Sequence, residues 1–594
     1  MIYHKSVMNN KFSLWTYLKP YKKYFIIACI AIVVENALEI SLPFLMDVLL
    51  TNGMIHNVDG SYSYNLSFVL MIGGIMIGFA IVAFMLGMLS ANFTAKAGRG
   101  MGYEMRKQEY IKIQEFSFNN LDEFRLNSLI TRMTSDIQII SDTACAILRP
   151  ILRAPFQLVF AITFAFIISK NLSVVFAIAV PTLALLFCLI ILLTRKNYYK
   201  MRQAIDKINR NTDESLTAMR LIRANAKKDY ENEKFNDVNN EVKTLGLKTL
   251  LLTASNQGIM HTTTYCCIIF ILLIGGSYAL NYNDANMANH IASFLSYTNQ
   301  TLASLTMLSN VFMMFTQTGA SLRRVKEVFE STNEIKENKN STLQVENGSV
   351  EFKDVFFKYH SDAKEYVLQD ISFKIDSGET VGILGETGSS KSTLVLLMER
   401  FYDINEGDIL ISNNNIKDYA LFELRDEIAI AFQKPRLFTG TIKENLLWGN
   451  PNASEEEIIS ACKIACCYDF IVNNLSDGFN TMLSQGGDNV SGGQRQRLCI
   501  ARALLKKPKI LILDDSFSAL DRITETQLKN NLKTYMPEMT KIIISQKIST
   551  IADADKIIVL NNGKISNIGD SEYLKEHDAI YQDIYKLQSM GLKE

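Results

Sequence analysis

Six apolar stretches, each long enough to cross a lipid bilayer, are confined to roughly the first half of this 594-residue chain. A helix that crosses the hydrocarbon core needs roughly 20 mostly apolar residues, and its backbone polar groups must be paired within the helix. The stretches cover residues 24–50, 66–90, 146–169, 172–193, 251–280 and 291–316. The sequence therefore predicts a helical membrane domain that is followed by a soluble domain.

The connections between these stretches differ in charge. The first, third and fifth hold almost no Lys or Arg, whereas the second and fourth are long and basic, with Lys96, Arg99, Arg106, Lys107, Lys112, Arg195, Lys196, Lys200 and Arg202. Because cytoplasmic loops carry the excess of basic residues, both termini and both long loops are predicted in the cytoplasm. Their helical spacing of apolar residues predicts that the spans continue as helices beyond the bilayer.

Ionisable residues occur within the membrane domain. Glu35 and Glu39 lie four residues apart in the first span and therefore share one helix face. Charged groups at such depth usually face the bundle interior or a water-filled cavity. Interhelical bonding and cavity lining both stay open, and we favour cavity lining for Glu35. Arg149 and Arg153 are expected to mark the cytoplasmic end of the third span.

Composition narrows the range of partners. Lys plus Arg and Asp plus Glu both number 61, so bulk charge gives no case for nucleic-acid binding. The nine cysteines include no CxxC pair, which predicts buried thiols rather than a metal site or a disulfide framework. A polar stretch at residues 331–347 reads as a linker between a membrane domain at 1–330 and a soluble domain at 348–594.

In the soluble half, a short apolar strand at 379–384 runs into a loop of the phosphate-binding type and then into a helix at 394–400. Successive backbone N–H groups and the helix N-terminus would surround phosphates, Lys391 would neutralise the terminal oxygens, and the Ser392 hydroxyl would face Mg²⁺. The candidate ATP-binding residues of this loop are Gly385, Glu386, Thr387, Gly388, Ser389, Ser390, Lys391, Ser392 and Thr393.

Further motifs follow in order. Gln433 comes directly after a predicted strand, and Ser491-Gly492-Gly493-Gln494 heads a predicted helix. Bare amides and a hydroxyl at a helix N-terminus can bind an anion, although this run by itself could also be a plain helix cap. A buried apolar strand ends in Asp514 and Asp515, and another apolar strand leads to Gln546.

In this order, the segments GETGSSKST, AFQKP, VSGGQRQR, LILDDSFSALD and ISQKIST resemble the ATPase domain of ABC transporters. With six preceding spans, the whole chain resembles a half-transporter of the ABC exporter family, and residues 129–136 and 214–222 are similar to that family's intracellular loops. The resemblance implies an all-α transmembrane domain with long intracellular helical extensions, followed by an α/β P-loop ATPase domain.

The resemblance also implies roles for single residues. Two ATPase domains would clamp around two ATP molecules, each site combining one chain's phosphate loop with the other chain's signature. Tyr359 would stack on adenine, and Ser491, Gly492, Gly493 and Gln494 would cap the ATP that the partner holds. Mg²⁺ would be held by Ser392, Gln433 and Asp514. Asp515 stands at the position of the general base, and Gln546 at that of the γ-phosphate sensor.

Three positions of the chain's own ATP site depart from the family pattern, which has Glu, His and Gly where this chain has Asp515, Gln546 and Ser390, and the signature has Val490 in place of a leucine. Aspartate is one methylene shorter than glutamate, and a misplacement of about 1 Å can cost on the order of 10²-fold in rate. Glutamine cannot become cationic as negative charge redistributes. We therefore expect a site that binds ATP and hydrolyses it poorly, similar to one chain of heterodimeric bacterial multidrug exporters.

These expectations combine into one hypothesis with two alternatives. The chain is predicted to be an integral protein of the bacterial plasma membrane. It would couple ATP hydrolysis to the export of amphipathic drugs, lipids or peptides, together with a different half-transporter that carries Glu and His. The alternatives are an active homodimer, in which Asp515 and Gln546 are tolerated, and a regulatory ATP-binding subunit that gates a partner. The sequence does not identify the cargo.

Overall fold

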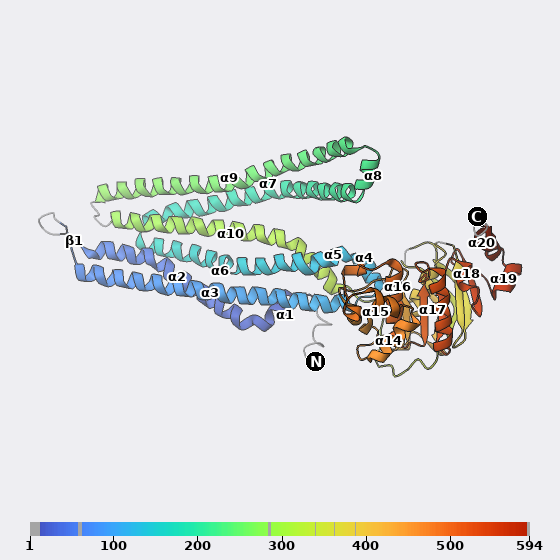
Figure 1. Ribbon diagram of the computed structural model, residues 1–594. Coiled ribbons are helices and arrows are strands. Elements are labelled where there is room, and N and C mark those ends of the chain that lie inside the picture. Colours follow the sequence, from blue (N-terminus) through green and yellow to red (C-terminus); the bar gives the residue numbers. More distant parts are fainter. Residues whose placement is uncertain are drawn as a thin grey trace. The chain divides into compact units, whose positions relative to one another are not determined.

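The computed structural model describes residues 12–56, 62–282, 287–338, 340–360, 363–386 and 388–590 (Figure 1). The chain divides into two compact units. The first comprises Met1–Gln114 and Leu126–Ser331, and the second comprises Glu115–Arg125 and Thr332–Glu594. The short segment Glu115–Arg125 is inserted in the sequence of the first unit but packs with the second.

Long helices make up most of the first unit (Figure 1). Within the described residues the six that carry the predicted apolar stretches are α2 (Lys22–Gly53), α3 (Leu66–Gln114), α6 (Ile137–Ile168), α7 (Lys170–Thr217), α9 (Lys228–Tyr282) and α10 (Met287–Glu330). The shorter elements are α1 (Leu14–Leu18), η1 (Lys19–Tyr21), β1 (Met54–His56), β2 (Tyr62–Tyr64), α5 (Leu126–Thr131), η2 (Arg132–Asp136) and α8 (Met219–Ala224).

Helix length and composition agree with a membrane domain. Four stretches of the described chain are long and apolar enough to cross a bilayer, namely Leu14–Gly53, Leu66–Gln114, Leu126–Ile168 and Gly258–Leu280, and Lys170–Leu183 is a shorter apolar helix. Helices α3, α7 and α9 have 49, 48 and 55 residues, far more than the roughly 20 that a crossing needs. The predicted helical extensions are therefore confirmed, and α7 and α9 run side by side to the short helix α8 that joins them (Figure 1).

The ionisable residues of the first span pair with the third. Arg149 forms an ion pair with Glu35, and Arg153 forms one with Glu39. Both pairs join residues 114 apart in sequence, so α2 and α6 run parallel and in one register. Glu35 is only 3% exposed, which favours the interhelical alternative over the cavity lining that we expected. The two arginines lie level with Glu35 and Glu39 of the first apolar stretch, and the carboxylates neutralise them.

The second unit is built around two sheets. In the larger sheet the strand order is β14-β13-β5-β12-β11-β8, and its five neighbouring strands from β13 to β8 are parallel. Its strands are β5 (Thr380–Gly385), β8 (Ile428–Ala431), β11 (Ile510–Asp514), β12 (Thr540–Ile544), β13 (Lys556–Asn561) and β14 (Lys564–Gly569). The smaller, antiparallel sheet contains β3 (Val350–Phe357), β4 (Leu368–Ile375), β6 (Glu406–Ile411) and β7 (Asn414–Asn415). The short strands β9 (Gly440–Thr441) and β10 (Met482–Leu483) pair with each other.

Helices cover this sheet system. They are α4 (Phe118–Phe124), α11 (Lys391–Met398), α12 (Leu421–Asp426), α13 (Ile442–Leu447), α14 (Glu455–Ile464), α15 (Tyr468–Asn474), η3 (Gly478–Asn480), η4 (Gln485–Gly487), α16 (Gly492–Leu505), α17 (Arg522–Tyr535), α18 (Ile548–Ile551), α19 (Ser571–His577) and α20 (Ala579–Met590).

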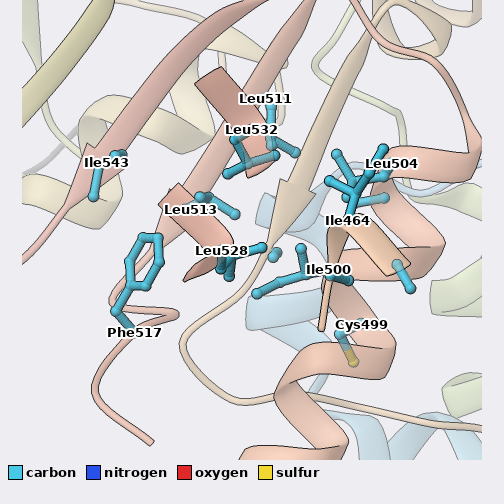
Figure 2. Close-up of a cluster of buried hydrophobic side chains, with 14 of the residues drawn as sticks. Ile464, Cys499, Ile500, Leu504, Leu511, Leu513, Phe517, Leu528, Leu532 and Ile543 are labelled. Carbon is cyan, nitrogen blue, oxygen red and sulfur yellow. The ribbon is translucent and has the colours of Figure 1, made fainter. Parts of the chain in front are cut away.

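The alternation of side chains along β11 divides its residues between two hydrophobic cores. Leu511 and Leu513 belong to a core with Ile500 of α16 and Leu528 of α17 (Figure 2). Ile510 and Ile512 face a second core with residues of β3, β4 and α11. Because both faces are buried, the strand is apolar at every position before Asp514, as is usual for parallel sheets. Packing on both sides holds the end of β11, and with it Asp514, in place.

Candidate nucleotide site

The loop between β5 and α11 has the backbone of a phosphate-binding loop. A Cβ atom on Gly385 would lie 2.5 Å from both the Leu560 carbonyl oxygen and Ser389 Oγ, so only glycine fits there. Gly388 has a φ of +89°, a left-handed conformation that favours glycine. The predicted site residue Thr387 lies outside the described residues.

Ser390, which precedes the first residue of α11, also has a left-handed backbone, with φ 71° and ψ 23°. For a residue with a Cβ atom this conformation costs on the order of 1 kcal/mol. The departure from glycine at this position therefore introduces a local strain next to Lys391.

The side chain of Lys391 folds back onto the phosphate-binding loop that precedes it. Its Nζ donates hydrogen bonds to the Gly385 carbonyl at 2.8 Å and to the Glu386 carbonyl at 2.7 Å. Burial lowers the pKa of Lys391, and the carboxylates of Asp514 and Asp515 oppose that shift. The ammonium group is thus held where the glycine-rich loop would meet a phosphate chain.

Ser392 and Asp514 form a pair of oxygen donors beside this lysine. Ser392 Oγ donates to Asp514 Oδ1 at 3.3 Å, and burial raises the pKa of Asp514. A hydroxyl and a carboxylate are oxygen ligands of the kind that Mg²⁺ prefers. The residues present therefore fit the metal that the sequence implied.

These groups line one cavity with a volume of about 290 Å³. It lies at the carboxyl ends of parallel strands, where open α/β sheets bind their ligands. Its walls come from the phosphate loop and the start of α11, the segment after β8, and the ends of β11 and β12 with the residues that follow them. The lining residues are Gly388, Ser390, Lys391, Ser392, Thr393, Gln433, Asp514, Asp515, Ile544, Ser545 and Gln546.

Asp515 and Gln433 face each other across this cavity. Gln433 Nε2 donates to Asp515 Oδ2 at 3.3 Å. Asp515 has a φ of 47°, so its backbone is left-handed directly after the strand ends. The residue at the general-base position and Gln433, which the resemblance implies as a Mg²⁺ ligand, are therefore neighbours.

Gln546 is held by a residue that the sequence reasoning missed. Gln588 of α20 donates from Nε2 to the Gln546 carbonyl at 2.7 Å and accepts from the Ile548 N–H at 2.9 Å. This bidentate contact positions the segment after β12. No local motif marks Gln588, because the contact depends on where α20 packs.

Tyr359 and the signature are not among the residues that line this cavity in the described part of the chain. The Tyr359 hydroxyl forms a hydrogen bond with Thr393 Oγ1 at 2.8 Å, one residue after Ser392. Ser491 caps α16, since its Oγ accepts from the Gln494 N–H and the Gln494 side chain accepts from the Ser491 N–H. Ser491 and Gly492 are exposed. The helix cap that the sequence allowed is thus present, and its outer end is free to meet another molecule.

Comparison with known proteins agrees with these observations. The family described as ABC transporter transmembrane region matches residues 25–305, and the family described as ABC transporter matches residues 368–518. The uncharacterized ABC transporter ATP-binding protein YfiB of Bacillus subtilis (strain 168) is 33% identical over 573 residues, which are 96% of this chain and 98% of that protein. The ATP-dependent lipid A-core flippase of Haemophilus influenzae (strain 86-028NP) is 29% identical, with 97% of each chain covered.

The same architecture occurs among solved structures. A bacterial Atm1-family ABC exporter with ATP bound matches 95% of this chain and 99% of its own, with a TM-score of 0.81 and 22% sequence identity, which shows a shared fold. The predicted fold class, a helical transmembrane domain followed by an ABC ATPase domain, is therefore confirmed. The chain belongs to the ABC transporter family, as a multi-pass integral membrane exporter with a cytoplasmic, ATP-binding ABC ATPase domain.

Proposed function

We propose that this exporter chain binds ATP at a site that hydrolyses it poorly, and that it works as one half of a heterodimer. The observation that carries the proposal is the wall of the nucleotide cavity, to which both Asp515 and Gln546 contribute. Both changes therefore fall inside the hydrolytic site and not on a remote surface.

The position of Asp515 supports slow hydrolysis. A general base must reach within about 3 Å of the water that it activates, and a loss of about 1 Å can cost on the order of 10²-fold. The carboxylate of Asp515 is one methylene shorter than that of glutamate, and its Oδ2 already accepts a hydrogen bond from Gln433. The shorter side chain reduces the reach of the carboxylate, and the hydrogen bond engages one of its two oxygens.

The neutral amide of Gln546 supports the same conclusion. An amide can donate a hydrogen bond to a phosphate oxygen, but it cannot carry a positive charge. Charge stabilisation in a preorganised site is commonly a large part of catalysis, so its loss slows the reaction. The Gln588 contact holds the backbone of Gln546, so the segment itself stays in place.

Residues for ATP and Mg²⁺ are present. Lys391 and the amides of the phosphate loop would hold the phosphate chain, and Ser392, Gln433 and Asp514 would hold Mg²⁺. Tyr359 would stack on the adenine. The metal, when bound, would neutralise charge on the phosphate oxygens.

The place of the signature supports a site shared between two chains. Ser491, Gly492 and Gly493 stand at the exposed N-terminus of α16 and are not part of the cavity wall that the structure describes. An exposed helix N-terminus with bare glycine amides is suited to an anion that another chain presents. This chain would lend its signature to the partner's working site, and the partner would carry Glu and His at the positions of Asp515 and Gln546.

The cargo is proposed to be amphipathic. Phe312 and Phe315 of α10 are exposed, at 64% and 53%, within the last apolar stretch. Flexible apolar walls accept varied hydrophobic shapes. The H. influenzae relative is named as a flippase of a lipid, which is itself an amphipathic molecule.

The direct test is the ATPase activity of the purified chain in lipid nanodiscs. We expect slow turnover by the unaltered chain and an increase on the order of 10²-fold for the double variant Asp515→Glu/Gln546→His. The matched control is Asp553→Glu/Gln527→His, which makes the same two changes at exposed positions. Rapid turnover by the unaltered chain alone would support an active homodimer and refute the proposal.

A further inference from the structure

Helix α4 is attached to the ATPase unit by two neighbouring aromatic residues. The ring of Phe118 lies 4.4 Å from that of Phe401 and 6.0 Å from that of Tyr402. The Tyr402 hydroxyl donates to Asp122 Oδ2 at 2.8 Å. These contacts join residues about 280 apart in sequence, and they place α4 directly on the segment that follows α11.

Tyr402 also contacts the residue at the proposed adenine position. The rings of Tyr359 and Tyr402 are 5.0 Å apart and nearly perpendicular, at 87°. Phe357 supports Tyr359 from the side, with ring centres 4.9 Å apart at 79°. Tyr359 is tied to the cavity through Thr393 Oγ1. A continuous series of contacts therefore leads from the nucleotide cavity through Tyr359 and Tyr402 to Asp122.

Packing leaves Tyr402 little freedom to absorb a movement of its neighbour. It is 6% exposed, and interiors packed at native density transmit displacements because few voids are available. Edge-to-face ring contacts depend on orientation, so a tilt of one ring changes the preferred position of the other. Burial, together with the hydrogen bond to Asp122, raises the pKa of Tyr402, which keeps the hydroxyl a donor.

We propose that Tyr402 is a positioning residue. When adenine binds against Tyr359, the resulting displacement of the Tyr359 ring is transmitted through Tyr402 to α4. The inference rests on the proposed stacking of adenine on Tyr359. It gives the ATPase domain a link to α4 that depends on the base of the nucleotide and not on its phosphate chain. In the chain, α4 lies between α3 and α5.

Hydrogen exchange of the full-length chain in nanodiscs tests this link without requiring a partner or a cargo. Two probes are compared, Mg·ATP and Mg·tripolyphosphate, which has the phosphate chain but no base. We expect tripolyphosphate to protect residues 388–393 only, and ATP to slow exchange in residues 115–125 as well. In Tyr402→Phe, which keeps the ring, ATP should still bind and protect the phosphate loop, but the change at 115–125 should be lost.

Two further variants make the result specific. Asp122→Ala removes the acceptor on the exposed side of α4 and should give the same loss, with no additional effect in the double variant. Tyr366→Phe is the matched control, because it also removes a tyrosine hydroxyl bonded to a carboxylate, that of Glu406, and should keep the response. A full ATP response at 115–125 in Tyr402→Phe, or an equal response to tripolyphosphate, would overturn the inference.

The failure of the underlying proposal would look different. If Tyr359→Ala binds ATP as tightly as the unaltered chain, Tyr359 does not hold the adenine. If that variant loses affinity while α4 never responds to ATP in the unaltered chain, the adenine role stands and the link through Tyr402 is refuted.

Discussion

Gln433 Nε2 and Asp515 Oδ2 lie 3.3 Å apart in the nucleotide cavity. The hydrogen bond occupies one oxygen of the carboxylate that stands at the general-base position. Activation of a water by that oxygen would require the bond to break or to be shared. The short side chain and the amide contact thus act in the same direction, and both hinder the transfer of a proton from water to Asp515.

The first prediction concerns the assembled exporter. If the site of this chain contributes little to turnover, Asp515→Asn should change the ATPase rate of the pair by less than about twofold. Replacement of the partner's glutamate by glutamine should abolish it. The measurement is the steady-state ATPase rate of the assembled exporter with either variant. A large loss of rate with Asp515→Asn would show that Asp515 is itself an active base.

Ser390 leads to a prediction about stability. Ser390→Gly should stabilise the ATPase domain by about 0.5–1 kcal/mol, because glycine adopts the left-handed conformation without strain. The midpoint temperature of thermal unfolding and the affinity for ATP should both increase. Ser389→Gly is the matched control, since Ser389 is buried and its φ is not positive, so glycine there should be neutral or destabilising.

Gln588 leads to a prediction about the segment after β12. Gln588→Ala removes two hydrogen bonds, each worth roughly 0.5–1.5 kcal/mol, and should increase hydrogen exchange at Gln546 and Ile548. The sheet, held by its own backbone bonds, should exchange as before. Gln582→Ala on the same helix is the control. Unchanged exchange at Gln546 in Gln588→Ala would mean that other contacts hold this segment.

Glu399 leads to a prediction about pH. Burial raises the pKa of Glu399 from 4.5 to about 7, with Lys506 and Arg425 opposing the shift. Between these values the folded state keeps a proton that the unfolded state has lost, so the stabilisation present below about pH 4.5 is lost as the pH rises to about 7. The total contribution is on the order of 3 kcal/mol.

Glu399→Gln should remove this dependence and leave the protein more stable at pH 8. The measurement is thermal unfolding of the full-length chain from pH 5 to pH 8, expressed as the difference between variant and unaltered chain. Glu346→Gln, at an exposed carboxylate, is the control and should give a flat difference. A flat difference for Glu399→Gln would show that Glu399 is charged throughout the range.

The membrane domain offers a test of its paired charges. Arg149→Ala leaves the buried Glu35 without its main partner and should destabilise the domain by about 3 kcal/mol. The exchange Glu35→Arg/Arg149→Glu should recover most of that loss in thermal unfolding in nanodiscs. If the exchanged pair is no better than Arg149→Ala, the carboxylate and guanidinium do not stabilise each other in the membrane.

The sequence by itself determined the elements whose signals are local. Long apolar runs predicted the helices of the membrane domain, because a span needs about 20 apolar residues wherever it stands. The order of the ATP-site motifs predicted the ATPase fold, because a strand, a glycine-rich loop and a helix N-terminus are specified by adjacent residues. Gly385 and Ser390 are also specified locally, because the backbone conformation at both positions is set by the phosphate-binding loop itself.

Only the tertiary structure decided which distant residues meet. It paired Glu35 with Arg149 between parallel helices, where the sequence had favoured cavity lining for Glu35. It placed Gln588 on the Gln546 segment and set α4 against Tyr402. Such contacts depend on how helices pack on sheets and on one another, and packing is selected by the whole core rather than by the residues adjacent in the chain.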